Sequence, residues 1–282
     1  MSVKRLYIIY ILLFPMCLFA GYKYDLAICT IFQNDAKYIP EWIEFHQKQG
    51  VQKFYLYNNL SQDDWQTFLK PYVKFGLIEI IEWPFIQESI NHWNEIQCNA
   101  YLDCVEKNKH QCRWIAFLDT DEFLFSPSKK DLRNVLKDYE EYAGVSANWV
   151  MYGTSNVQEI LPGEKMLDRL LYRSALNSPV NLHVKTIANP RKIARCNNPH
   201  FFIYIESHAV TENKEFIDGP FSSRNSVNIL RINHYWQRDL KFLREVKIPR
   251  QRKWWGRTDE QCKEMETMYN DEYDPILANT SS

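Results

Sequence analysis

The residues best suited to chemistry follow a short apolar run near the middle of the chain. Residues 114–118 (W-I-A-F-L) carry no charge, as expected of a strand buried on both faces. Asp119, Asp121 and Glu122 follow at once, with Thr120 between the two aspartates. Because side chains alternate along an extended backbone, Asp119 and Asp121 point to the same side and can share one hard cation. The pattern predicts a Mg²⁺ or Mn²⁺ site that also binds a substrate phosphate.

Two other interpretations of these acids remain. They can cap the next helix or lie in water, as chance D-x-D tripeptides in soluble proteins do. The apolar run before them and the aromatic residue after them favour the metal site. Haloacid-dehalogenase-type phosphatases also place D-x-D at a strand end, but their motif continues with threonine or valine where this chain has Phe123. The phosphatase alternative is therefore weakly supported.

Composition limits the classes of protein that this chain can belong to. Its 282 residues, of which 45% are hydrophobic, are enough for one large domain or two small ones. The formal net charge is -1 with both signs interspersed, which gives no support to nucleic-acid binding. Aromatic residues make up 15% of the chain. Such residues often line sugar-binding sites, although core packing explains most of them.

The first 21 residues differ from the rest. Lys4 and Arg5 precede an almost wholly apolar stretch over residues 6–19, which is short for a membrane span. We predict a signal peptide or a short membrane anchor over residues 1–21, hence an exported or membrane-associated protein. Residues 22–282 would then form a single domain. Six cysteines lie there without a C-x-x-C pair, so disulfides are possible but their pairing cannot be deduced.

The elements before the acidic motif alternate between strands and helices. Strands are predicted over residues 25–32, 53–57 and 77–83, and helices over residues 38–46, 63–75 and 87–110. This alternation predicts right-handed crossovers and a parallel sheet. Acids at the carboxyl end of a parallel strand lie where open α/β sheets bind their ligands. The fold class is therefore α/β, and the acidic motif lies at its ligand-binding edge.

The second half of the chain is richer in strands and less regular. A helix is predicted over residues 130–142 and strands over residues 145–151, 183–187, 193–196, 201–205 and 227–236. The polar loop 153–163 is predicted to be a wall or lid of an acceptor site. Residues 238–257 are strongly basic and helical in pattern. They form either a solvated face or a surface for phosphates or a membrane.

Three stretches resemble the family 92 glycosyltransferases and related bacterial family-2-like enzymes. They are residues 37–61 (KYIPEWIEFHQKQGVQKFYLYNNLS), residues 114–123 (WIAFLDTDEF) and residues 231–236 (RINHYW), in the family's order. The resemblance runs from about Asp25 to Arg257. It implies a GT-A-type, Rossmann-like fold with a mixed, mostly parallel sheet and flanking helices. It also implies a nucleotide-sugar donor, a glycan or glycolipid acceptor, a divalent metal and inversion at the anomeric carbon.

The resemblance assigns a metal site to three residues. Asp119 and Asp121 would hold the ion that bridges the donor diphosphate, and Asp119 would thereby contact the donor. His234, in the family's late motif, would be a third ligand. The alternative for His234 is a core histidine bonded to the backbone.

The resemblance also implies contacts with the donor nucleotide. Asn58 and Asn59 match a loop in which the family more often carries Asp-Asn, and an amide there can still hydrogen-bond a base or ribose. Lys185 and Arg191 resemble a basic motif that would meet phosphates, and ordinary surface charge is the alternative.

An inverting transfer needs a general base to accept the proton of the acceptor hydroxyl. Glu122, Glu206 and Asp218 are the candidates, and the sequence does not choose between them. His200 and His208 flank this region as ligands, bases or structural residues. A non-catalytic carbohydrate-binding protein on the same fold is the alternative function.

Overall fold

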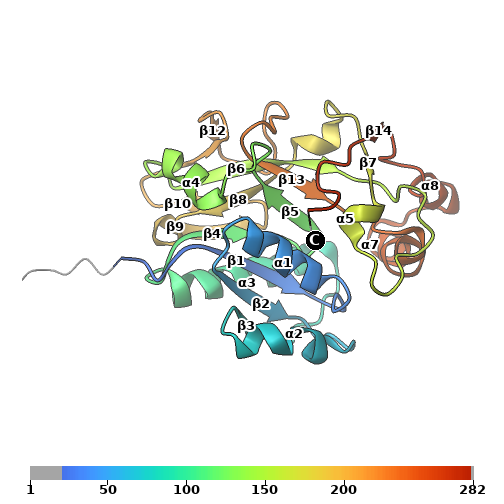
Figure 1. The fold of residues 1–282 in the computed structure, drawn as a ribbon, viewed down its shortest axis with the longest axis horizontal. Helices are drawn as coiled ribbons and strands as arrows, with labels where there is room; N and C mark the ends of the chain where they lie inside the picture. Colours follow the sequence, from blue (N-terminus) through green and yellow to red (C-terminus); the bar gives the residue numbers. More distant parts are fainter. Residues whose placement is uncertain (1–20, 281–282) are drawn as a thin grey trace, which may run out of the picture.

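The computed structural model describes residues 21–280 (Figure 1). The predicted signal peptide or anchor falls almost wholly outside these residues. Among the helices described, none combines the length and the apolar character that a membrane crossing requires.

Four parallel strands form the first half of the central sheet. They are β1 (Tyr24–Phe32), β2 (Lys53–Asn58), β3 (Ile78–Glu82) and β4 (Cys112–Phe117). β1 lies between β4 and β2, and β3 pairs with β2. The helices between them are α1 (Ile39–Lys48), α2 (Trp65–Lys74) and α3 (Ile90–Asn108). All four strands therefore end at one edge, where β4 runs into the acidic motif.

The second half of the sheet is mixed. β8 (Val184–Ala188) is antiparallel to both β4 and β6 (Gly144–Met151). β6 pairs in parallel with β11 (Ala209–Thr211), which carries the short antiparallel strand β12 (Phe216–Ile217). Further along, β6 pairs in parallel with β13 (Arg231–His234), and β13 is antiparallel to β5 (Glu122–Phe125). This register puts His234 opposite Glu122.

The remaining elements surround this sheet. They are α4 (Leu132–Leu136) with a 3₁₀ turn (Lys137–Tyr139), α5 (Met166–Arg169), β7 (Tyr172–Arg173), 3₁₀ turns at Pro179–Leu182 and Pro190–Lys192, β9 (Ile193–Asn198), β10 (Phe201–Tyr204), α6 (Leu240–Phe242), a π-helical turn (Leu243–Lys247), α7 (Ile248–Trp255), α8 (Asp259–Glu264) and β14 (Glu272–Tyr273). Figure 1 shows α7 and α8 together beside the carboxyl edge of the sheet.

Side-chain alternation along β1 divides the core into two layers. Ile28 packs on the side of α1 with Trp42 and Ile43, whereas Cys29 packs on the side of α3 with Tyr101. Both faces of the strand are therefore covered, as its uninterrupted apolar sequence predicts. The six cysteines of the described region are buried free thiols.

The predicted α/β fold with a mostly parallel sheet is confirmed, and the differences lie at element ends. The helix predicted over residues 130–142 is the shorter α4 followed by a 3₁₀ turn. The Asp131 side chain accepts a hydrogen bond from the Arg133 backbone N–H, which fixes the start of this helix. The strand predicted from residue 227 begins at Arg231, because the Glu212 carboxylate accepts the backbone N–H groups of residues 228–230 instead.

Candidate active site

The acidic motif is a tight turn between two strands. β4 ends at Phe117, and the Glu122 N–H donates to the Asp119 carbonyl at 3.1 Å. Helix α1 fixes the next strand, because Trp42 Nε1 donates to the Glu122 carbonyl at 2.8 Å and His46 Nε2 accepts from the Leu124 N–H at 3.0 Å. The acids are thus attached to the core through backbone groups on both sides.

Asp119 lies between two neutralising partners. Its Oδ2 is 3.0 Å from the Lys185 ammonium of β8, and its Oδ1 accepts from Gln97 Nε2 at 2.7 Å. Burial raises the pKa of Asp119, but the adjacent Lys185 more than offsets this and holds the pKa below its usual value. The carboxylate stays 36% exposed, so it remains available to a ligand.

Asp121 is more deeply enclosed. Its Oδ2 is 3.2 Å from Lys247 Nζ, and its Oδ1 is 3.2 Å from His234 Nε2. Burial raises the pKa of Asp121, yet Lys247 and His234 outweigh it and hold the pKa well below the usual range. Asp121 is therefore an ionised carboxylate at neutral pH.

Glu122 differs from the two aspartates. Its side chain is fully buried, accepts the Asp119 N–H at 2.8 Å and lies 3.5 Å from Lys185. Burial raises the pKa of Glu122 well above its usual value, with Lys185 opposing the shift only in part. The arrangement supports the turn and leaves Glu122 out of reach of the cavity described below.

A fourth acid, Asp35, is held beside the motif by two hydrogen-bonding partners. Its Oδ2 accepts from the Thr120 hydroxyl at 2.8 Å, and its Oδ1 pairs with Arg238 at 2.7 Å. The buried Arg238 guanidinium lies over the Tyr38 and Phe242 rings at 3.9 and 4.4 Å from their centroids. This cation links the carboxyl end of β1 to the segment after β13.

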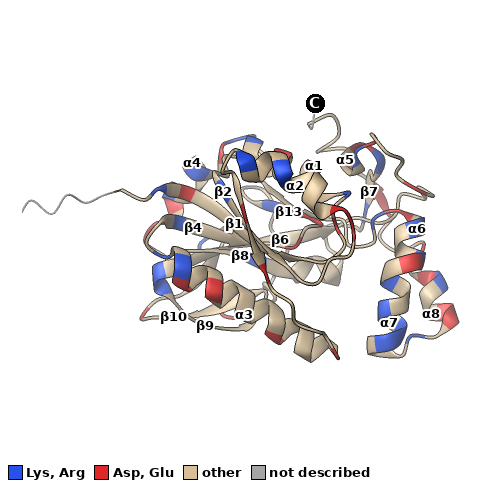
Figure 2. Cartoon of the chain, turned by 90° about the horizontal axis from the view of Figure 1, so that it is seen from below, with Lys and Arg blue, Asp and Glu red and all other residues tan. Residues whose placement is uncertain are grey.

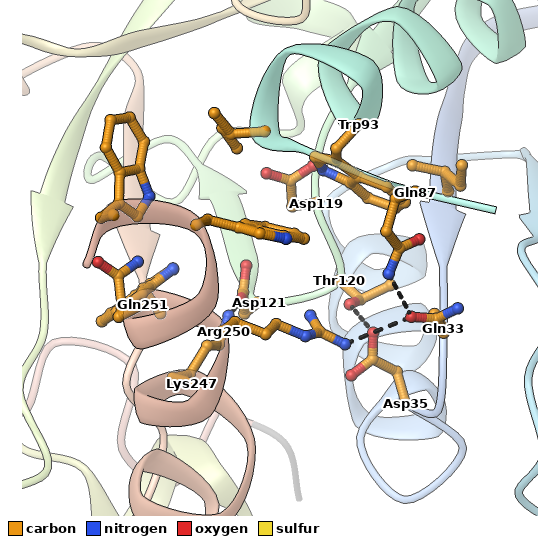
Figure 3. Close-up of a pocket in the computed structure, with 15 residues that line it drawn as sticks. Gln33, Asp35, Gln87, Trp93, Asp119, Thr120, Asp121, Lys247, Arg250 and Gln251 are labelled. Carbon is orange, nitrogen blue, oxygen red and sulfur yellow. Dashed lines mark hydrogen bonds and ion pairs between the residues drawn. The ribbon is translucent and has the colours of Figure 1, made fainter. Parts of the chain in front are cut away.

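Asp35, Asp119 and Asp121 border one cavity of about 900 Å³, counting the part that is open to solvent. Figure 3 shows Asp119 and Asp121 between the β1 end, with Gln33 and Asp35, and α7 on the opposite side.

Helix α7 turns one basic face toward this cavity. Lys247, Arg250, Gln251 and Trp254 recur at helical spacing and all line the cavity. Lys247 closes the π-helical turn before α7, and such turns are common at functional sites. Figure 2 shows the lysines and arginines along this segment. The predicted basic segment is thus a wall of the cavity on this face.

Three other residues that were predicted to contact the donor bond to protein groups instead. Lys185 is 1% exposed and pairs with Asp119 and Glu122, so it neutralises acids and does not face a ligand. Asn58 donates to Glu82, and Asn59 donates to the Trp83 and Phe85 carbonyls. Both asparagines are buried, and neither lines the cavity. They fix the loop after β2 in this structure.

Arg191 lies at the opposite edge of the sheet. It follows β8 beyond Ala188, which pairs with Ile115 near the start of β4. Its guanidinium stacks on the Tyr22 ring at 4.6 Å, and its Nε donates to the Lys109 carbonyl. The sheet therefore separates Arg191 from the acidic motif, contrary to the expected phosphate contact.

Glu206 and Asp218 flank the hairpin of β11 and β12, where both are exposed. β11 is separated from β4 by β8 and β6, which amounts to roughly 14 Å at the usual spacing of about 4.8 Å per strand. His208 is also exposed there, while His200 bonds the Val184 carbonyl through Nδ1. Burial lowers the pKa of His200 to about 3, as befits a neutral structural histidine. The structure brings none of the three candidate bases to the cavity.

Sequence reasoning missed Asp35, and it did not decide which face of α7 is functional. Asp35 follows a parallel strand at its carboxyl end, which is a usable signal. The spacing of Lys247, Arg250 and Trp254 would have identified a common face, but not what that face covers.

The donor set can be tested for a divalent ion. Within residues 21–280, no three His, Cys, Asp or Glu side chains are arranged to hold a metal by themselves. Asp119 and Asp121 nevertheless offer carboxylate oxygens to one cavity. Mg²⁺ and similar ions are commonly held by one or two carboxylates plus substrate phosphates. The residues therefore fit an ion that binds together with a phosphorylated ligand.

An acidic turn faces a basic helix at the carboxyl edge of the parallel strands, which is where open α/β proteins bind their ligands. The comparison with protein families gives a specific result, because the family model described as glycosyltransferase family 92 matches residues 23–272. The chain belongs to this family, in agreement with the resemblance and the GT-A-type fold inferred from the sequence.

Curated relatives match only part of the chain. A family 92 protein of Oryza sativa is 29% identical over 118 residues, covering 41% of this chain and 19% of the relative. The beta-1,4-galactosyltransferase galt-1 of Caenorhabditis elegans is 34% identical over 110 residues, covering 36% and 25%. Galactan beta-1,4-galactosyltransferase GALS2 of Arabidopsis thaliana is 26% identical over 127 residues, covering 43% and 24%. The chain thus matches about a quarter or less of each relative's length.

Similarity to solved structures is more distant. TarS 1-349 of S. aureus in complex with UDP has a TM-score of 0.36 and 11% identity, covering 59% of this chain and 47% of that one. Glucosyl-3-phosphoglycerate synthase from Mycobacterium tuberculosis in complex with Mn²⁺, UDP and its product has a TM-score of 0.31 and 12% identity, covering 45% and 44%. At these scores the site assignment rests on this chain's own geometry.

Proposed function

We propose that this protein is a metal-dependent glycosyltransferase that moves a sugar from a nucleoside-diphosphate donor to a hydroxyl of a glycan or glycolipid, with inversion. The observation that carries the proposal is the cavity in which Asp119 and Asp121 face Lys247 and Arg250. Family membership supports the reaction class. Because two of the relatives are named as galactosyltransferases, galactose is the first sugar to test.

The α7 face supplies the contacts for the diphosphate. Lys247 and Arg250 bring two cations to a cavity that also contains the ionised Asp121. Burial lowers the pKa of Lys247, with Asp121 opposing the shift and Arg250 adding to it. A diphosphate between these side chains would give Lys247 a second anionic partner besides Asp121 and would also contact Arg250, through charge-assisted hydrogen bonds.

On the opposite wall, Gln33 and Gln87 carry amide groups that can bind a base or ribose. Gln87 donates to Gln33 at 3.1 Å, so the two amides form one polar edge at the end of β1. Trp93 also lines this wall and offers a ring for stacking. In this proposal the nucleoside lies between β1 and the start of α3.

Asp119 and Asp121 would hold Mn²⁺ or Mg²⁺ when the donor is present. When bound, the ion supplies positive charge for the diphosphate as it departs. In transfer, the acceptor oxygen forms a bond to the anomeric carbon while the bond from that carbon to the diphosphate oxygen breaks. The diphosphate leaves with the electron pair, and the hydroxyl proton passes to a general base.

A screen of nucleotide sugars tests this function. The protein is incubated with each donor and Mn²⁺, and release of nucleoside diphosphate is measured with and without a panel of glycans. We expect release from at least one donor, with UDP-galactose the first choice, and its loss in Asp121→Asn. Mn²⁺-independent sugar binding without turnover of any donor would favour the non-catalytic carbohydrate-binding alternative.

A further inference from the structure

A second cavity adjoins the first one. It encloses about 870 Å³, counting the part that is open to solvent. Trp236 and Gln251 line both cavities, so the two spaces share a wall. His234 lines the second cavity, and its Nε2 is 3.2 Å from Asp121, which lines the first. A ligand in each cavity would therefore meet the other near the Asp121–His234 pair.

Three side chains that line the second cavity, Trp149, Gln237 and His234, carry a buried polar atom without a hydrogen-bond partner. Trp149 Nε1 is a donor and Gln237 Oε1 is an acceptor, and neither makes a hydrogen bond within the protein. Trp149 is 7% exposed and Gln237 is fully buried. Leaving a buried polar group unpaired is costly, so such groups in one wall call for an explanation. A ligand hydroxyl both donates and accepts, and can satisfy either atom.

The rest of the lining is aromatic, amide and thioether in character. Tyr269 adds a ring to those of Trp149 and Trp236, and Met265 and Met268 add flexible apolar surface. Arg257 and Glu264 contribute one charge of each sign. The second cavity thus lacks the surplus of facing cations that would select an anion. Rings beside hydrogen-bonding groups suit an uncharged sugar, which presents apolar C–H faces and hydroxyl edges.

The wall that carries these residues is held in place by the loop after β6. A Cβ added at Gly153 would lie 2.6 Å from the Met268 carbonyl oxygen, so the two backbones pack without space between them. The Ser155 N–H donates to Asn270 Oδ1 at 2.8 Å. The sequence predicts that the loop 153–163 is a wall or lid of the acceptor site. It does not line the second cavity, but it positions the segment that does.

We propose that the second cavity is the acceptor site and that it binds an uncharged glycosyl unit through Trp149, Gln237 and the rings around them. This inference rests on the proposed function, since it takes the first cavity as the donor site. Its distinct content is the class of acceptor and the residues that recognise it. The hydroxyl to be glycosylated would lie toward His234 and Asp121.

The decisive variant is Met268→Trp, which fills the second cavity from its rim. Met268 is 39% exposed, so a larger side chain can be placed there without entering the core. Val73→Trp on α2 is the matched control, because Val73 is 47% exposed and lines neither cavity. The measurements are transfer to neutral β-1,4-galactan oligosaccharides, binding of UDP with Mn²⁺, and donor hydrolysis without acceptor. We expect at least a tenfold rise in acceptor KM for Met268→Trp alone, with UDP binding and hydrolysis unchanged.

A second variant, Trp149→Phe, removes the unpaired N–H while breaking no hydrogen bond within the protein. It should raise the acceptor KM several-fold and leave UDP binding unchanged. An unchanged acceptor KM in both variants would overturn the inference, as would lost UDP binding in Met268→Trp. So would preferential use of acidic oligosaccharides such as galacturonans over neutral ones. Failure of the proposed function differs from all of these, because the wild type would then hydrolyse no donor.

Discussion

The two cavities differ in the charge of the groups that line them. In the first, every acid has a cation within reach: Lys185 at Asp119, Lys247 at Asp121 and Arg238 at Asp35. The second is lined mainly by neutral groups, with Arg257 and Glu264 as one charge of each sign. Unpaired buried polar atoms occur in both, on Gln87 and Trp254 in the first and on Trp149 and Gln237 in the second. A site prepared for a charged ligand and its ion must be neutralised when empty, because buried like charges are costly. A site for hydroxyl groups can stay open, since neutral groups cost far less to leave unpaired.

This comparison changes one step of the sequence argument. The sequence predicts that Asp119 and Asp121 share one hard cation, which would also relieve the repulsion between two nearby carboxylates. The structure shows that lysines and an arginine can serve this purpose, so the repulsion alone does not demand an ion. What still favours an ion is the exposure of Asp119 to the cavity and the cations of α7, which point to a phosphate ligand.

The largest expected effect concerns Asp121. Asp121→Asn keeps the side-chain shape but removes the charge that would hold the ion, and we expect transfer to fall about 10³-fold, as for loss of a strong electrostatic contact in other active sites. The measurement is the initial rate of transfer at saturating donor. Asp259→Asn is the control, because that carboxylate is 93% exposed and pairs only with Arg252. Equal loss in both variants would contradict the assignment.

The next largest effect concerns Lys185, the buried cation that neutralises acids at the first cavity. Lys185→Met leaves Glu122 and Asp119 without their buried cation, so we expect a loss of about 3 to 5 kcal/mol in the free energy of unfolding. Urea denaturation measures it. The double variant Lys185→Met with Glu122→Leu should recover part of the loss, because it removes one buried acid as well. No recovery would mean that Lys185 acts mainly through Asp119.

A smaller effect is a pH dependence that arises from His46. Burial lowers the pKa of His46 to about 3, with its bond to the Trp42 carbonyl opposing the shift. Since the unfolded pKa is about 6.5, the unfolded chain binds the extra proton and stability falls as the pH drops from about 6.5 toward 3. At pH 5 the loss is about 2 kcal/mol relative to neutral pH. Urea denaturation should show a slope that is smaller by this amount in His46→Leu than in the wild type, because His200, whose pKa is also lowered to about 3, keeps its own contribution in both.

The smallest effect concerns the α7 face. Lys247→Met removes one diphosphate contact and should weaken UDP binding about tenfold, which corresponds to about 1.4 kcal/mol. Lys253→Met, on the exposed side of the same helix, should change nothing. Calorimetric titration of both variants with UDP and with uridine separates phosphate contacts from base contacts. Equal weakening for uridine would place Lys247 at the nucleoside instead.

The sequence predicted the first cavity better than the second for a physical reason. Buried parallel strands have continuous apolar runs, and residues 114–118 therefore located the acids at the ligand edge of the sheet. The second cavity combines Trp149 and Met151 of β6 with side chains from residues 234–269, which meet only through the packing of short helices after β13. Hydrophobic periodicity in the sequence does not predict such contacts, so Trp149 and Gln237 were not identified.

The predicted roles divide in the same way. Asp119, Asp121 and His234 come together because β5 and β13 pair in register, and the motifs that contain them were visible in the sequence. Glu206 and Asp218 are candidate general bases by residue type and region alone, because the sequence does not reveal the strand order. That order places β11 and β12 beyond β6, away from the acidic turn.

Calorimetric titration of the protein with UDP, Mn²⁺ and both together tests the central claim most directly. If Asp119 and Asp121 hold an ion only in company with a diphosphate, each ligand alone should bind weakly and the pair at least tenfold more tightly. Asp121→Asn should abolish this gain. UDP binding that is the same with and without Mn²⁺, and the same in Asp121→Asn, would contradict the account.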